Sequence, residues 1–151
     1  MSALGEELRK KGVGDVDERE ESLLKFSRDA SLFMVRPEVI VAPKNASDIE
    51  RLVQFVAEKS RRPQGVGIPT KASGKKISIT ARAAGTDMSG GPLNDSIILD
   101  TTKYLNHLVS IDTKSAVVEP GMYFRDFDKE TKKKNLELPS YTASRELCTV
   151  A

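Results

Sequence analysis

Apolar positions along the chain follow two kinds of spacing, which predict strands and helices in a definite order. Residues 38–42 are a β-branched run between two prolines, as expected for a buried strand. The next stretch has the spacing of an amphipathic helix, because its apolar side chains fall at i, i+3, i+4 and i+7. These side chains are Ile49, Leu52, Val53 and Val56. Ser47 followed by Glu50 predicts a capping box at the start of this helix.

The pattern before the first strand is more polar. Residues 6–11 are charged and lead into two glycines, so we expect a short helix or a frayed arm, and we treat residues 1–16 as an N-terminal arm. Residues 17–29 have a helical pattern with acids near the beginning, where the helix dipole favours them, and Asp17 is placed to cap it. The main domain is therefore expected over residues 17–151.

Strands dominate the second half of the chain. A glycine-rich loop is expected over residues 64–76, followed by an alternating strand over 76–82 and an apolar strand over 96–100. Because a helix separates the first two predicted strands, they are expected to form a parallel βαβ unit with a right-handed crossover. The remaining elements are an antiparallel hairpin and an amphipathic helix, expected over residues 107–112, 115–119 and 122–134.

These elements predict an α+β fold, in which a small parallel βαβ subdomain is followed by the start of an antiparallel β subdomain with flanking helices. A length of 151 residues fits one domain. The net charge of +2 argues against nucleic-acid binding, so Lys132-Lys133-Lys134 is interpreted as a solvated helix end. A single cysteine, Cys148, and a single histidine, His107, argue against a disulfide framework and a zinc site. A membrane span needs ~18 apolar residues and a secretory signal needs an apolar core; neither occurs, so a cytoplasmic location is expected.

One segment has the composition of a ligand-binding loop. Residues 84–91, Ala-Gly-Thr-Asp-Met-Ser-Gly-Gly, lie between two predicted strands, and their small side chains let a ligand approach the backbone. Successive N–H groups in such a turn form an anion-binding nest, to which Thr86 and Ser89 add hydroxyl donors, and a diphosphate is the natural guest. Asp87 fits beside an anion only if its side chain turns away, for example to form the turn. The alternative is a glycine-rich connection that serves the fold alone.

Two commoner phosphate motifs are incomplete in this chain. Gly85 and Gly90 have Walker A spacing, but the Lys and Ser/Thr that should follow are absent. Gly65-Val66-Gly67 begins like a dinucleotide-binding fingerprint, but its third glycine and the preceding strand are absent. A magnesium site is a further alternative to solvated turn acids, and its candidate ligands are Asp87, Asp95 and Asp100.

Several motifs occur together in an order that characterises one family. They are residues 27–31 (Ser-Arg-Asp-Ala-Ser), 36–43, 48–56, 80–91 (Thr-Ala-Arg-Ala-Ala-Gly-Thr-Asp-Met-Ser-Gly-Gly), 97–100, 117–121 and 139–150. In this order they resemble the FAD-binding domain of the vanillyl-alcohol oxidase / para-cresol methylhydroxylase type. Within that group the chain is similar to the FAD-linked oxidases of the glycolate oxidase and D-lactate dehydrogenase kind. The resemblance covers roughly residues 25–151 and departs from the family at Ala83, where a glycine is usual.

The resemblance implies that the chain binds FAD, and binds it non-covalently, since the histidine that tethers FAD in some members is absent from this loop. It further implies that the backbone of residues 84–90 cradles the diphosphate while a second segment runs along the flavin. The implied cofactor-binding residues are Arg82, Ala83, Ala84, Gly85, Thr86, Asp87, Met88, Ser89, Gly90, Gly91, Pro139, Ser140, Ser144, Cys148 and Thr149. The resemblance assigns no catalytic residue and no metal ligand in this chain.

Members of this family are longer and carry a separate substrate domain. The resemblance therefore implies that this chain is the N-terminal part of a flavin-dependent oxidoreductase acting on a small 2-hydroxy acid such as glycolate or D-lactate. Such a fragment is expected to be inactive alone, with FAD and the missing C-terminal substrate domain as its partners. Apolar surface that further strands would cover could also support a homodimer. The alternative is a stand-alone α+β binding or interaction module without redox activity.

Overall fold

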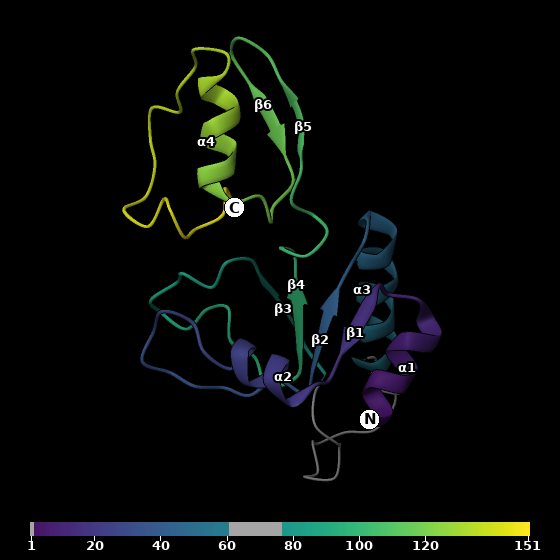
Figure 1. Cartoon of the computed structure of the whole chain (residues 1–151). Helices are drawn as coiled ribbons and strands as arrows, with labels where there is room; N and C mark the ends of the chain where they lie inside the picture. The colour runs from purple at the N-terminus through teal and green to yellow at the C-terminus, as the bar shows by residue number, and fades with distance from the viewer. Residues whose placement is uncertain (1, 61–76) are drawn as a thin grey trace, which may run out of the picture.

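The computed structural model describes residues 2–60 and 77–151, which form two lobes (Figure 1). The sheet lobe, residues 2–60 and 77–106, is built on a four-stranded sheet, and the hairpin lobe, residues 107–151, on a two-stranded one. The loop predicted over residues 64–76 lies outside the described residues. In chain order the elements are α1 (Ala3–Lys11), β1 (Asp15–Asp17), α2 (Glu20–Phe26), β2 (Val39–Ala42), α3 (Ala46–Ser60), β3 (Ile79–Arg82), β4 (Ile97–Asp100), β5 (Leu108–Ile111), β6 (Ala116–Val118) and α4 (Phe124–Lys132).

The larger sheet has the strand order β1-β2-β4-β3. Both β2 and β3 run parallel to β4, and Val39 and Ile79 lie on either side of Ile97. Because α3 connects β2 to β3, the predicted parallel βαβ unit is confirmed, with β4 inserted between its two strands. The carboxyl ends of these strands share one edge of the sheet, so the segments that follow β3 and β4 start side by side.

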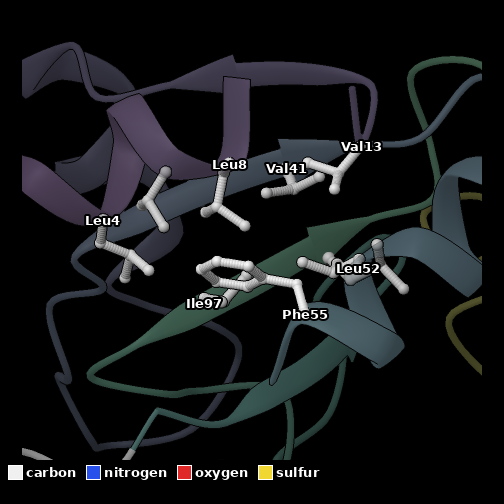
Figure 2. Packing of buried hydrophobic residues seen from close by; sticks show 9 residues of the cluster. Leu4, Leu8, Val13, Val41, Leu52, Phe55 and Ile97 are labelled. Atoms are coloured by element: carbon white, nitrogen blue, oxygen red, sulfur yellow. The ribbon is translucent and has the colours of Figure 1, made fainter. Parts of the chain in front are cut away.

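Helices α1 and α3 cover one face of this sheet, and α2 lies on the other. Side chains alternate along a strand, so Val39 and Val41 point to the face of α1 and α3, whereas Ile40 packs with Leu23 of α2. Figure 2 shows how side chains from both helices meet the strands. The main cluster comprises Leu4, Leu8, Val13, Val39, Val41, Leu52, Phe55, Ile97 and Leu99. Burial on both faces explains why these parallel strands are continuously apolar in sequence.

The N-terminal residues belong to this core. Of the two alternatives for residues 6–11, the structure has the helix, and Leu8 of α1 is fully buried. The residues expected as an arm thus contribute α1 and most of β1, which is antiparallel to β2. The helix predicted over residues 17–29 is shorter, and Asp17 does not cap it, because β1 includes Asp17 and its carboxylate pairs with Arg19 at 2.7 Å. Pairing with β2 overrode the local helical pattern.

The start of α3 differs from the predicted capping box at Ser47 and Glu50. The helix begins at Ala46, and its cap lies two residues earlier than predicted, because Asn45 accepts a hydrogen bond from the Asp48 N–H at 3.1 Å. In return the Asp48 carboxylate accepts from the Lys44 N–H at 2.7 Å. An Asn and an Asp three residues apart therefore supply the reciprocal cap that the sequence interpretation gave to Ser47 and Glu50.

The hairpin lobe contains the predicted antiparallel strands and the helix that follows them. The Asp112 carboxylate holds the turn between β5 and β6 by accepting from the N–H groups of Lys114 and Ser115, each at 2.7 Å. Phe124 and Phe127 of α4 are buried with Met122 and Cys148 in a separate small core. Lys132 and Lys133 are exposed at the end of α4 and form ion pairs with Asp128 and Glu130 of the same helix, which is consistent with a solvated helix end. The predicted α+β fold is confirmed.

Candidate functional site

A cavity of about 280 Å³ lies where the two lobes meet. Most of its wall is the end of β3 and the segment that follows it, and the rest comes from the residue after β4, from the segment between β6 and α4 and from the C-terminal residues. Its lining residues are Ala81, Arg82, Ala83, Ala84, Gly85, Thr86, Asp87, Pro92, Thr101, Pro120, Thr149 and Ala151. The parallel strands point their carboxyl ends at this cavity, which is the edge where open α/β sheets place ligands.

Two glycines shape the loop after β3. Gly85 has a φ of 72° and Gly90 a φ of 83°, both in the left-handed region that favours glycine. A Cβ on Gly85 would clash with the guanidinium of Arg82, and one on Gly90 would lie 2.8 Å from the ring of Phe33. Both positions therefore need glycine for the backbone conformation and for close packing beneath the loop, rather than to leave room for a ligand.

Arg82 lies under the loop with its side chain turned into the protein. Its guanidinium donates to the carbonyl oxygens of Phe26 at 3.0 Å and Arg28 at 2.6 Å, and it stacks on the Phe26 ring at 5.1 Å from the centroid. Helix α2 ends at Phe26, so these carbonyls have no helical partner and attract a cation. Burial lowers the pKa of Arg82, which the carboxylates of Asp29 and Asp100 partly oppose. Arg82 thus joins the end of α2 to the loop.

Asp87 divides the loop into two halves with different hydrogen bonding. Its Oδ1 accepts from the Ser89 N–H and hydroxyl, both at 2.6 Å, and from the Gly91 N–H at 3.4 Å. These Ser89 donors hold the pKa of the exposed Asp87 carboxyl below its usual range. Among the described residues, the N–H groups of Ala84, Gly85 and Thr86 donate to no protein acceptor. The N–H groups of residues 84–86 therefore have no protein partner in the described part of the chain, whereas Asp87 takes up those of Ser89 and Gly91.

The C-terminal segment reaches the cavity through short β-type pairing with residues 122–124. The Phe124 N–H donates to the Cys148 carbonyl at 3.0 Å, and the Val150 N–H donates to the Met122 carbonyl at 2.8 Å. This pairing places Thr149 and Ala151 at the cavity, opposite the loop after β3. The site is therefore built from segments about 60 residues apart, which the sequence order alone does not bring together.

The structure brings only part of the predicted cofactor-binding set to this cavity. The members that line it are Arg82, Ala83, Ala84, Gly85, Thr86, Asp87 and Thr149. The members outside its lining are Met88, Ser89, Gly90, Gly91, Pro139, Ser140, Ser144 and Cys148. Pro139 and Ser140 lie exposed beyond α4, whereas Cys148 is buried in the hairpin-lobe core. The assignment of these residues to a cofactor stays a prediction.

Five lining residues were missed in the sequence interpretation: Ala81, Pro92, Thr101, Pro120 and Ala151. A signal existed for Thr101, which directly follows a buried parallel strand and hence lies at the ligand-binding edge. The others carry no distinguishing chemistry, so only their place in the fold reveals them.

The described residues contain no group of three or more His, Cys, Asp or Glu side chains that could hold a metal ion. Asp87, Asp95 and Asp100, the candidate magnesium ligands, therefore do not form such a group. Within the same described part of the chain, no helix is both long and apolar enough to cross a membrane.

Comparison with known proteins gives consistent matches. The family model described as "FAD binding domain" matches residues 37–151. The glycolate oxidase subunit GlcD of Bacillus subtilis is 24% identical over 144 residues, which are 92% of this chain and 27% of that protein. The D-2-hydroxyglutarate dehydrogenase of Escherichia coli is 24% identical over 114 residues, 75% of this chain and 10% of that protein. The chain thus spans about a quarter or less of these relatives.

A solved structure of p-cresol methylhydroxylase with substrate bound has the same fold over this region. It superposes with a TM-score of 0.72 at 19% identity, covering 97% of this chain and 28% of that one. At this identity the likeness concerns the fold alone.

Proposed function

This chain belongs to the FAD binding domain family, and from that premise we propose that it is the FAD-binding part of a flavin-dependent oxidoreductase acting on a small 2-hydroxy acid. One observation carries the proposal at the level of the site. The N–H groups of Ala84, Gly85 and Thr86 lack protein acceptors and lie in the wall of the cavity at the carboxyl edge of the parallel strands. Unpaired backbone donors in a tight turn are the chemistry that a diphosphate needs.

The residues present fit the cofactor. In this proposal the amides of residues 84–86 hold the diphosphate, Thr86 adds its hydroxyl, and Arg82 fixes the loop from beneath. Thr149 and Ala151 face the cofactor from the hairpin lobe. When bound, the flavin supplies the hydride-accepting chemistry, and the protein positions and tunes it. In this proposal attachment is non-covalent, because the single histidine of the chain, His107, is not among the residues that line the cavity.

The substrate class rests on the relatives. The names of the Bacillus subtilis and Escherichia coli proteins concern glycolate and D-2-hydroxyglutarate, which share a hydroxyl group next to a carboxylate. We infer that the groups orienting such a substrate lie in the parts of those proteins that this chain does not span, and that the chain alone does not turn over. The cytoplasmic location stays a prediction.

A homodimer is part of the same proposal. The hairpin turns Val109 and Val117 to solvent, 64% and 55% exposed, on the face away from α4. A two-stranded sheet with an apolar outer face is marginal in water, which favours association. Light scattering checks this, and a monomer mass at concentrations well above those in a cell would contradict it.

The first experiment is a titration of the purified chain with FAD by isothermal calorimetry, together with its visible spectrum. We expect saturable binding. In Gly85→Val we expect binding to be lost, because the new side chain would displace Arg82 and force the loop out of its left-handed turn. Gly91→Ala is the matched control in the same loop, since its Cβ would meet only ordinary contacts at 3.6 Å or more.

Circular dichroism keeps the outcomes separable. A folded wild-type chain without FAD binding would overturn the proposal that this part of the protein holds the cofactor, and would favour an α+β module without redox activity. Equal FAD affinities of Gly85→Val and Gly91→Ala would instead place the cofactor away from this loop.

A further inference from the structure

Asp87 occupies an unexpected position for an acidic residue. It lines the cavity, yet its Oδ1 already accepts three hydrogen bonds from the loop, two from Ser89 and one from Gly91. A carboxylate that fills an anion nest does what a ligand phosphate would do there. The donors of Ser89 and Gly91 are therefore satisfied before any ligand arrives, and a fixed negative charge lines the same cavity as the unpaired N–H groups of residues 84–86.

We propose that Asp87 is a specificity determinant, which confines the ligand's diphosphate to residues 84–86 and selects a bridging diphosphate over one that ends in a free phosphate. This inference rests on the proposed function. It concerns which kind of phosphate ligand the loop prefers, whereas the proposed function concerns whether the loop binds a phosphate ligand at all.

The physical basis is the charge that each ligand brings to Asp87. A diphosphate that bridges two nucleoside-like groups carries one negative charge per phosphate, about two in all, because each phosphorus has one ester and one anhydride link and so keeps one ionised oxygen. ATP has a third phosphate, and its terminal phosphate carries up to about one further charge, so ATP brings about four. Repulsion from the Asp87 carboxylate grows with the ligand's charge, which penalises ATP more than FAD.

Asp87 cannot relieve this repulsion by swinging away at low cost. Moving its side chain would leave the N–H groups of Ser89 and Gly91 and the Ser89 hydroxyl without their acceptor. The same donors lower its pKa, so the group stays charged at neutral pH. The charge is therefore a permanent feature of the cavity lining.

Asp87→Asn tests the inference, because the Asn amide oxygen can accept the same backbone hydrogen bonds without the charge. FAD affinity is measured by calorimetry, and ATP affinity by competition against FAD. For an exposed pair in 0.15 M salt we expect about a twofold gain per ligand charge, hence roughly fourfold tighter FAD and roughly fifteenfold tighter ATP. Asp95→Asn is the matched control, since it removes an equal charge from the same connection outside the cavity lining.

A second readout separates charge from structure. The difference between wild type and Asp87→Asn should shrink as salt rises toward 1 M, since screening acts on charge and leaves the shape of the turn unchanged. Equal gains for FAD and ATP, no gain, or a gain that ignores salt would overturn the inference while FAD binding stands. A folded chain that binds no FAD would overturn the proposed function, and this inference with it.

Discussion

The two lobes bury their side chains to very different degrees. The sheet lobe has a main cluster of nine buried hydrophobic residues from two helices, two strands and a connecting segment, and a second cluster against α2. In the hairpin lobe four buried residues, Met122, Phe124, Phe127 and Cys148, form the core. The strands follow the same division: β2 and β4 are buried along their whole length, whereas β5 and β6 expose Val109 and Val117.

The cavity therefore lies between a lobe with a large buried core and a lobe with a small one. The loop after β3 starts from the well-packed sheet, and Arg82 fixes it to α2. Thr149 and Ala151 come from the lobe with the smaller core. Regions with few buried contacts open first, so we expect the hairpin lobe to open without the sheet.

Phe55→Ala in the sheet lobe should have the largest effect. Phe55 is 2% exposed in the main cluster, and truncating a buried phenylalanine costs about 3–5 kcal/mol through lost burial and the cavity left behind. Urea unfolding followed by circular dichroism measures this loss. Val53→Ala on the exposed face of α3 is the control, with about 0.5 kcal/mol or less expected. Equal losses in the two variants would contradict the assignment of this core.

Phe127→Ala should act locally. Phe127 is 5% exposed, and its loss should destabilise the hairpin lobe by about 3 kcal/mol while the parallel sheet keeps its structure. Hydrogen exchange checks this: amides of β5 and β6 should lose protection, whereas those of β2 and β4 should not. Uniform loss of protection across both lobes would mean that they unfold as one unit, and would contradict the expectation that the hairpin lobe opens without the sheet lobe.

Arg82→Met should have a smaller effect on stability, but a marked one on the site. It leaves the carbonyls of Phe26 and Arg28 without donors, for an expected loss of about 1–3 kcal/mol, and it frees the loop beneath Gly85. Arg82→Lys should restore part of both stability and FAD affinity. Arg125→Met is the hairpin-lobe counterpart, because Arg125 donates to one carbonyl, that of Glu146, near the surface.

In this last pair, thermal unfolding and FAD calorimetry should separate the two arginines. We expect Arg125→Met to lose about 0.5 kcal/mol and to keep its FAD affinity. Equal losses of FAD affinity in both variants would argue that Arg82 has no special role in positioning the loop.

Much of the fold followed from local pattern, and the errors have a common cause. The strands β2 and β4 were predictable because burial on both faces makes a strand continuously apolar. Helix α3 was predictable because burial of one face imposes a helical period on the sequence. β1 was missed because three residues carry no period, and pairing with β2 decides their conformation. The cap of α3 was misplaced because Asn45 and Asp48 offer the same chemistry two residues before Ser47 and Glu50.

The features of the site also divide into those that local pattern predicted and those that it did not. A glycine-containing loop with small side chains after a strand could be predicted from the sequence, because such a loop needs residues that tolerate a positive φ. The inward turn of Arg82 to the end of α2, the pairing of Asp87 with Ser89 and Gly91, and the position of Thr149 at the same cavity as the loop became visible only in the folded chain. These features depend on hydrogen bonds and contacts between residues far apart in the sequence, and local sequence patterns do not indicate which distant residues come into contact.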